Sequence, residues 1–160
     1  MDPTDTDGLL PGKISLYRIE LIVLVSLVLI YGQGTFQRNY IWKNNVSLWS
    51  DVVKKSPFKA RAYEYLGLAY HQNGDMDSAI QQYIKGLSLA PCSADLHNNI
   101  GISYFEKGMT DLAIQHFKTA VELNPVHADA HYNLGVAYGN KGLFELANEE
   151  MRKGMALGRR

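Results

Sequence analysis

A repeat with a period of about 34 residues constrains this sequence more than any other feature. The stretch YLGLAYHQNGD begins at Tyr65, and close variants of it return as NIGISYFEKGM from Asn99 and as NLGVAYGNKGL from Asn133. Self-similarity at a fixed spacing of this size is the sequence signature of an array of small units that stack on one another. We therefore interpret most of the chain as a repeat array, in which each unit buries its apolar face only against its neighbours.

Residue types agree at several offsets within each copy. The matching positions are Gly67, Gly101 and Gly135; Tyr70, Tyr104 and Tyr138; Ala79, Ala113 and Ala147; and Tyr83, Phe117 and Met151. Pro91 lies one period before Pro125. This pattern resembles the tetratricopeptide repeat (TPR), whose repeats are helical hairpins. The resemblance implies an all-α solenoid with three full repeats over residues 58–160.

Breakers divide each copy into two helices. Gly-containing turns fall in the middle of each repeat, and the two prolines end the second helix. The expected helix pairs are 60–73 and 76–89, 94–107 and 110–123, and 128–141 and 144–157, within repeats at about 60–93, 94–127 and 128–160.

Small residues inside these helices indicate where helices approach closely. Gly inside a helix costs about 1 kcal/mol relative to Ala, so Gly101 and its equivalents are expected at close helix contacts. Gly86 and Gly154 stand where the TPR pattern has Ala, and we expect them to loosen the packing of the first and third repeats. The last helix is expected to be a solvated cap.

The period also extends backwards from the first full repeat. Pro57 lies one period before Pro91, and Trp49 lies one period before Tyr83. Residues 37–57 are therefore predicted to be a juxtamembrane segment followed by a degenerate half repeat. This half repeat should dock on the first full repeat.

The amino-terminal region has a different character. Residues 1–13 are acidic and rich in Pro and Gly, which favours a flexible tail. Residues 14–36 are predicted to form a single transmembrane helix, because about 20 apolar residues span a hydrocarbon core. Its apolar centre consists of Leu21, Ile22, Val23, Leu24, Val25, Leu27, Val28, Leu29 and Ile30. A cleaved signal peptide and a buried core helix remain alternatives, although the acidic start and the poor cleavage site argue against the former.

Two arguments disagree on which side of the membrane carries the repeats. The Lys and Arg residues that flank the span lean towards cytoplasmic repeats. In contrast, residues 14–70 resemble the junction between the last membrane helix and the first TPR in bacterial glycosyltransferase-like (TMTC-type) membrane proteins. That resemblance implies the periplasmic side, which is our expectation.

The sequence contains no recognisable catalytic constellation. No phosphate-binding loop, dinucleotide fingerprint or zinc-protease motif is present. His127 and His131 have the spacing of a metal-ligand pair on one helix, but His131 occupies a large-residue packing slot, so we expect a structural role. We predict no catalytic residue, no metal and no cofactor. The formal net charge of zero gives no indication of a nucleic-acid partner.

The remaining candidate for a site is a surface. The TPR resemblance implies that the first helix of each repeat lines a concave face that binds a partner. The candidate residues are Arg61, Glu64, Tyr65 and Leu68; Asn98, Asn99, Ile102 and Phe105; and Asp129, Tyr132, Asn133 and Val136. Asn99 and Asn133 stand one repeat apart and are expected to pair with the backbone of an extended peptide.

Three positions on these helices also argue against one specialised class of partner. TPR co-chaperones hold an acidic carboxy-terminal tail with basic residues, whereas this chain has Glu64, Asp129 and Asn133 at the corresponding positions. A carboxylate would therefore be repelled.

These features predict a non-catalytic, membrane-anchored TPR scaffold. Its partners would be a protein or peptide, in particular another membrane protein or complex, and the lipid bilayer, without nucleic acid. It would act as an accessory subunit or assembly factor. The alternative is a substrate-binding arm of, or derived from, a polytopic glycosyltransferase-like membrane enzyme. A soluble secreted TPR module is a third possibility, if the amino terminus is a signal sequence.

Overall fold

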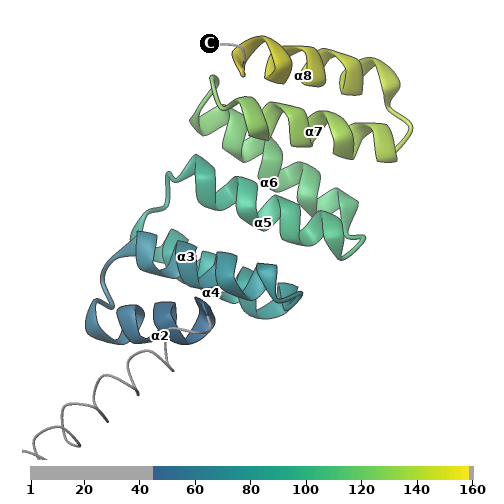
Figure 1. Ribbon diagram of the computed structural model, residues 1–160. Coiled ribbons are helices and arrows are strands. Elements are labelled where there is room, and N and C mark those ends of the chain that lie inside the picture. Colours follow the sequence, from purple (N-terminus) through teal and green to yellow (C-terminus); the bar gives the residue numbers. More distant parts are fainter. Residues whose placement is uncertain (1–44, 159–160) are drawn as a thin grey trace, which may run out of the picture. The chain divides into compact units, whose positions relative to one another are not determined.

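The computed structural model describes residues 45–158, so the predicted tail and the predicted membrane helix lie outside the described residues. All regular structure between residues 45 and 158 is α-helical. The helices are α2 (Asn45–Lys55), α3 (Ala60–Gln72), α4 (Met76–Leu89), α5 (Ala94–Glu106), α6 (Thr110–Leu123), α7 (Ala128–Asn140) and α8 (Phe144–Leu157). Figure 1 shows them as successive antiparallel hairpins. In this part of the chain, no helix has the length and apolar character needed to cross a membrane.

The predicted helix pairs are confirmed, except that the first helix of each pair ends one residue earlier than expected. A Schellman motif ends these helices, because a glycine with positive φ follows each one: Gly74 (80°), Gly108 (75°) and Gly142 (76°). The next residue then donates its backbone N–H to a tyrosine carbonyl five residues back, as from Asp75 to Tyr70 over 3.0 Å. This bond satisfies a carbonyl that the helix itself leaves open.

The helices stack in an order that curves the array. Each second helix packs on the first helix of the next repeat, as α4 does on α5 and α6 on α7, and α2 packs on α3 in the same way. The first helices α3, α5 and α7 also contact one another in sequence, whereas no comparable contact joins α4 to α6 or α6 to α8 in the described chain. The first helices therefore lie on the inside of the curve, and we call their exposed surface the inner face.

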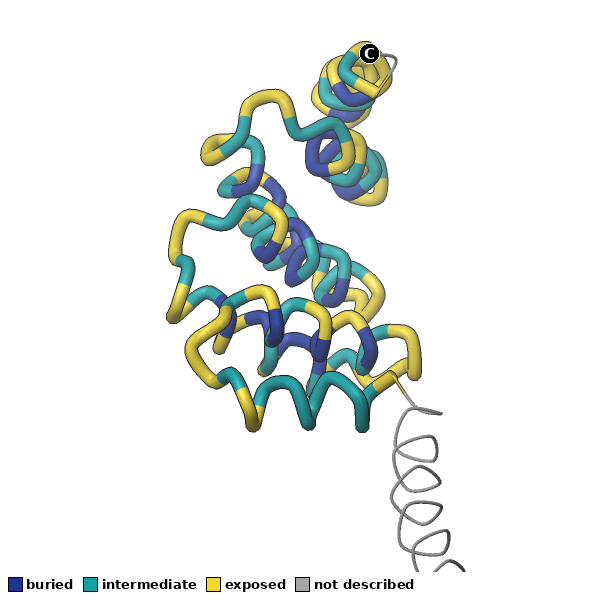
Figure 2. Tube along the Cα trace, turned by 60° about the vertical axis from the view of Figure 1, so that its left-hand side comes forward, coloured by how far each residue is buried: buried dark blue, intermediate teal, exposed yellow. Residues whose placement is uncertain are grey.

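Glycines at the expected positions allow the two helices of a repeat to touch. A Cβ atom added to Gly101 would lie 2.6 Å from the Phe117 ring, which is too close for any real contact. Phe117 is itself buried in the core between the second and third repeats, together with Ala113 and Leu134. Figure 2 shows that the buried residues lie along the helix sides that face one another. The predicted role of the mid-helix glycines is therefore confirmed.

The expectation that Gly86 and Gly154 loosen the packing is wrong. Both residues are buried. A Cβ atom added to Gly154 would lie 2.8 Å from the carbonyl oxygen of Ala128, and one added to Gly86 would lie 3.1 Å from the Leu96 side chain. These glycines thus tighten the contact, because the missing methyl group lets a neighbouring helix move closer.

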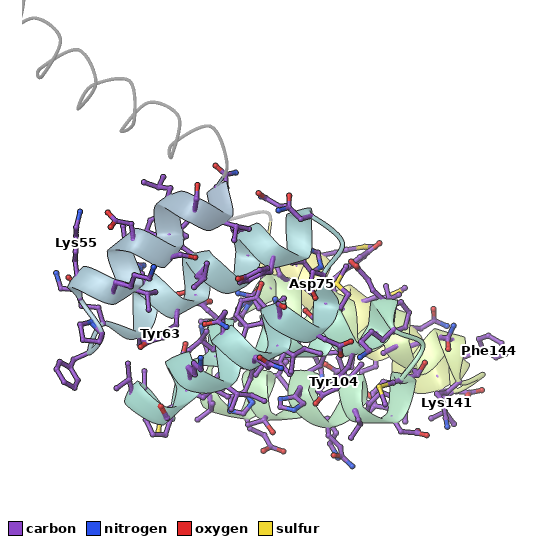
Figure 3. All side chains as sticks on the ribbon, turned by 90° about the horizontal axis from the view of Figure 1, so that it is seen from below. Lys55, Tyr63, Asp75, Tyr104, Lys141 and Phe144 are labelled. Carbon is purple, nitrogen blue, oxygen red and sulfur yellow. The ribbon has the colours of Figure 1, made fainter. Side chains whose placement is uncertain are left out.

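Ion pairs repeat along the array as well. Lys107 follows α5 and pairs with Asp77 in the first turn of α4, and Lys141 pairs with Asp111 over 2.8 Å one repeat later. Lys141 is labelled in Figure 3. All four side chains are at least partly exposed, so each pair contributes about 0–1 kcal/mol. These ion pairs recur at equivalent places in successive repeats, but they contribute little to the stability of the stack.

Candidate functional site

The structure places the predicted site residues on the three inner helices with different degrees of exposure. Those that are exposed are Arg61, Tyr65, Leu68, Asp129 and Tyr132. Those that are half-buried are Glu64, Asn99, Ile102, Phe105, Asn133 and Val136. One of the predicted residues, Asn98, is only 6% exposed and is not available to a ligand.

Asn98 is buried and bonds to the next repeat. Nδ2 of Asn133 on α7 donates a hydrogen bond to Oδ1 of Asn98 on α5 over 3.0 Å. The two asparagines therefore form an inter-repeat contact. Asn133 keeps its own Oδ1 as an acceptor, but one of its donors is already used, which the sequence pattern did not reveal.

Asn99 is in a different situation. Its side-chain amide makes no hydrogen bond to any residue between 45 and 158, and it lines a small hollow of about 50 Å³. The other residues that line the hollow are Leu68, His71, Tyr83 and Ile102. A free amide with both a donor and an acceptor thus stands beside an apolar recess between the first two repeats.

The amino-terminal end of the inner face is partly covered by the half repeat. The indole of Trp49 on α2 stacks on the Tyr65 ring with 4.5 Å between the ring centroids and 22° between their planes. Tyr65 remains 37% exposed. Trp49 was not predicted at this surface, although its alignment with the large core residue Tyr83 indicated that it would pack against the next helix.

Carboxylates outnumber cations on the first helices. Glu64 has a raised pKa because it is partly buried and because Asp95 lies nearby, an effect that Arg61 opposes. Two other carboxylates pair with histidines of other helices, one on α3 and one at the start of α7. Glu106 lies 3.1 Å from His71, and Asp95 lies 3.1 Å from His127.

The two histidines with metal-ligand spacing do not face a common point. His127 caps α7 by accepting the Ala130 N–H through Nδ1, over 3.3 Å. His131 is buried, and its two ring nitrogens bond Glu150 over 2.5 Å and the Pro125 carbonyl over 3.0 Å. Within residues 45–158 no group of three or more potential metal ligands occurs. The packing role expected for His131 is therefore confirmed.

Comparisons with known proteins agree with this architecture. A family model described as "TPR repeat" matches residues 67–108 and 103–142, and one described as "Tetratricopeptide repeat" matches residues 128–157. No curated protein shows significant similarity to the chain.

Solved structures are similar in fold. A crystal structure of MamA is 28% identical to this chain, with a TM-score of 0.64. The match covers 70% of this chain and 66% of the MamA chain, so this chain spans slightly under two thirds of that protein. The first TPR of Spaghetti (RPAP3), bound to the HSP90 peptide SRMEEVD, is 27% identical with a TM-score of 0.60, covering 62% of this chain and 79% of that one. A MamA double mutant is 23% identical with a TM-score of 0.64 over 81% of this chain and 70% of that one, and it shows the fold alone.

Proposed function

This chain belongs to the tetratricopeptide repeat family, and from that premise we propose that it is a non-catalytic scaffold whose inner face binds an extended segment of a partner protein. The observation that carries the proposal is the free amide of Asn99 beside the hollow between Leu68 and Ile102. Such an amide can pair with the N–H and C=O of a peptide backbone, while a small side chain of the peptide enters the hollow.

The chemistry of the inner face indicates what kind of segment it binds. The first TPR of Spaghetti is bound to an HSP90 peptide that ends in Glu-Glu-Val-Asp. The present chain carries Glu64 and Asp129 on its first helices, and Asp95 lies near Glu64, where its charge adds to the rise in the Glu64 pKa that burial causes. Because like charges repel in a half-buried site, we propose a neutral or basic segment rather than an acidic tail.

We further propose that residues 14–36 anchor the scaffold in a membrane as a single span. The apolar composition of this segment supports the anchor. Only residues 37–44 separate it from α2, so the repeats would act close to the bilayer. The partner would then be another membrane protein or complex, and the resemblance of residues 14–70 to TMTC-type proteins favours repeats on the periplasmic side. The same resemblance supports the alternative of a substrate-binding arm of a glycosyltransferase-like enzyme.

Photo-crosslinking in cells tests the binding face. A photoreactive amino acid at Leu68 on α3 should form a crosslink to a discrete partner, whereas the same amino acid at Ile84 on α4 should not. Both positions are solvent-exposed aliphatic residues of the first repeat, at 39% and 51% exposure, so accessibility does not bias the comparison.

A substitution at Asn99 then tests whether the crosslink from Leu68 depends on the Asn99 amide. Asn99→Ala should weaken the crosslink from Leu68 by about tenfold, because a buried backbone group of the peptide loses its partner. A crosslink that forms equally well from Ile84, or that survives Asn99→Ala unchanged, would place the binding surface elsewhere on the array.

A further inference from the structure

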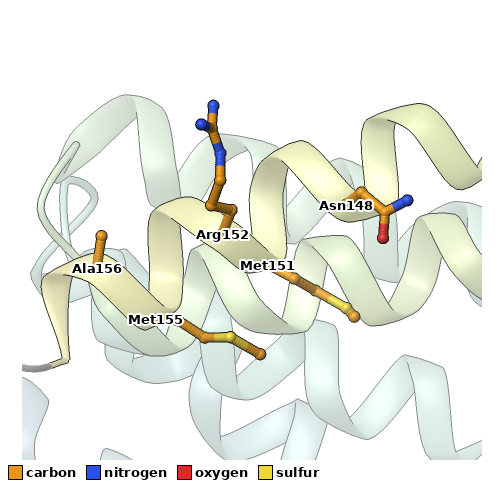
Figure 4. Close-up of a pocket in the computed structure, with 5 residues that line it drawn as sticks. All are labelled: Asn148, Met151, Arg152, Met155 and Ala156. Atoms are coloured by element: carbon orange, nitrogen blue, oxygen red, sulfur yellow. The ribbon is translucent and has the colours of Figure 1, made fainter.

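The outer face of α8 is a second surface with the features of an interface. By the repeat period, Met151 and Met155 correspond to Phe117 and Val121 of α6, which pack against the first helix of the next repeat. Met151 packs partly on Gly135 of α7 and is half-buried, whereas Met155 is 53% exposed, and no further helix among residues 45–158 stacks on this side of α8. The place where a further helix would stack is an open hollow lined by Asn148, Met151, Arg152, Met155 and Ala156 (Figure 4).

This face is more apolar than a terminal repeat requires. We expected a solvated cap, and a cap of a soluble array is normally polar on its outer side. Phe144 is instead 64% exposed, and in Figure 3 its ring projects from the edge of the array near Lys141. Exposed apolar residues that line up on one helix face indicate contact with another surface.

The spacing of the residues on this face is symmetric. Phe144, Asn148, Met151 and Met155 follow one another at intervals of four, three and four residues, which is the spacing of the seam of a coiled coil. Because the sequence of intervals is the same in both directions, two copies of α8 in antiparallel orientation would place Phe144 opposite Met155 and Asn148 opposite Met151.

The charges beside this seam are complementary in the same orientation. Glu145 and Arg152 directly follow two seam residues, Phe144 and Met151, and both are exposed. In an antiparallel pair, the residues that directly follow these seam residues lie next to the corresponding residues of the other helix. Their charges determine partner choice and helix orientation. Glu145 of each copy would therefore meet Arg152 of the other.

We propose that α8 is a self-association surface on which α8 of a second copy packs antiparallel about a two-fold axis. The first helices α3, α5 and α7 cannot fill the hollow, because the preceding second helix already covers each of them. Among the helices of residues 45–158, the uncovered face with the matching pattern is that of α8 itself. An interface of one short helix per copy is small, so the dimer is weak. This surface is distinct from the inner face and does not depend on peptide binding.

Disulfide trapping tests the orientation directly. In full-length protein in mild detergent with Cys92→Ser, one sample carries Phe144→Cys and a second carries Met155→Cys. Mixing the two should give a disulfide between the different variants, whereas each variant alone should crosslink poorly. Preferential crosslinking of each variant to itself would mean a parallel pair and would overturn the proposal.

Sedimentation of charge variants tests the contact without added cysteines. Glu145→Arg should weaken dimerisation about tenfold by setting two cations against each other, and adding Arg152→Glu in the same chain should restore it. Met155→Glu should abolish it, whereas Met109→Glu, at an exposed methionine of the second repeat, should not. A chain that stays monomeric at several hundred micromolar, or dimers that are indifferent to all of these changes, would exclude α8 as the interface. Circular dichroism of each variant verifies that the helices are intact.

Discussion

The side-chain amide of Asn133 donates a hydrogen bond to the buried Oδ1 of Asn98, one repeat earlier, over 3.0 Å. The side chain of the adjacent Asn99 makes no such bond within the described residues. Two neighbouring asparagines on α5 thus differ in their contacts. Asn98 joins the repeats, whereas the side-chain amide of Asn99 has no hydrogen-bond partner within residues 45–158.

This difference predicts different results for two alanine variants. Asn133→Ala should lower the free energy of unfolding by about 1–3 kcal/mol, because it leaves the buried Asn98 oxygen without a donor. Asn99→Ala should change it by less than about 0.5 kcal/mol, since no bond within the array is lost. Urea unfolding followed by circular dichroism measures both. Equal effects would mean that the bond between Asn98 and Asn133 does not stabilise the stack.

Two glycines inside first helices should respond in opposite directions to the same substitution. Gly101→Ala should destabilise the array by about 1–3 kcal/mol, because the new methyl group meets the Phe117 ring. A Cβ atom added to Gly139 has only the Ala147 side chain nearby, at 3.8 Å. Gly139→Ala should therefore stabilise the array by up to about 1 kcal/mol, since Ala favours the helix. Thermal melting compares the two variants. If Gly101→Ala raises the melting temperature, the close contact at Phe117 is absent.

The histidine pair of the second repeat should make stability depend on pH. Nδ1 of His97 lies 3.1 Å from Nδ1 of His116. Burial lowers the pKa of His97, although a hydrogen bond to Pro91 opposes it, and burial together with His97 lowers the pKa of His116. The unfolded chain, with imidazoles near the ordinary value of 6.5, therefore binds more protons than the folded chain just below that pH.

By linkage, the free energy of unfolding should fall as the pH drops through about 6.5. His116→Gln should flatten this dependence. Glutamine is the residue at the equivalent position of the first repeat, Gln82. Unfolding curves between about pH 5 and 8 measure the slope for both proteins. A slope that is the same in the variant would show that other groups cause it.

The stacking of Trp49 on Tyr65 should hold the half repeat on the array. Trp49→Ala removes an aromatic contact and its buried surface, so the free energy of unfolding should drop by about 1–3 kcal/mol. Phe58→Ala, at a ring that is 85% exposed, serves as the control and should be nearly neutral. Faster hydrogen exchange confined to α2 in the Trp49 variant would show directly that the half repeat has loosened, and unchanged protection would contradict the role of the stack.

Much of the fold was predictable because equivalent positions in the copies of the repeat can be compared with one another. A residue that recurs once in every repeat must satisfy the same local environment each time, so Gly101 could be assigned to a close helix contact from sequence alone. The ends of the paired helices were predicted to within one residue. The remaining error arose because, in the Schellman motif, the residue before the glycine with positive φ is the C-cap and lies just outside the helix.

The candidate site was only partly predictable from the same pattern. Periodicity placed Asn98, Asn99 and Asn133 on the inner helices, but it assigns a residue to a helix face and does not say which neighbour the side chain finds. Whether an amide bonds across a repeat or stays free depends on distances between helices that are far apart in sequence. How the helices stack therefore determines which amide is bonded and which is free.

The sequence by itself determined that residues 58–157 form helical hairpins, where the turns lie, and which small residues permit close packing. These properties follow from the local conformational preferences of Gly and Pro and from the spacing of apolar residues. Only the tertiary structure decided that Gly86 and Gly154 tighten their contacts, that Asn98 is buried, and that the seam on α8 stays uncovered within the described chain. Each of these depends on how closely one helix approaches the next, and that distance results from packing all the side chains at once.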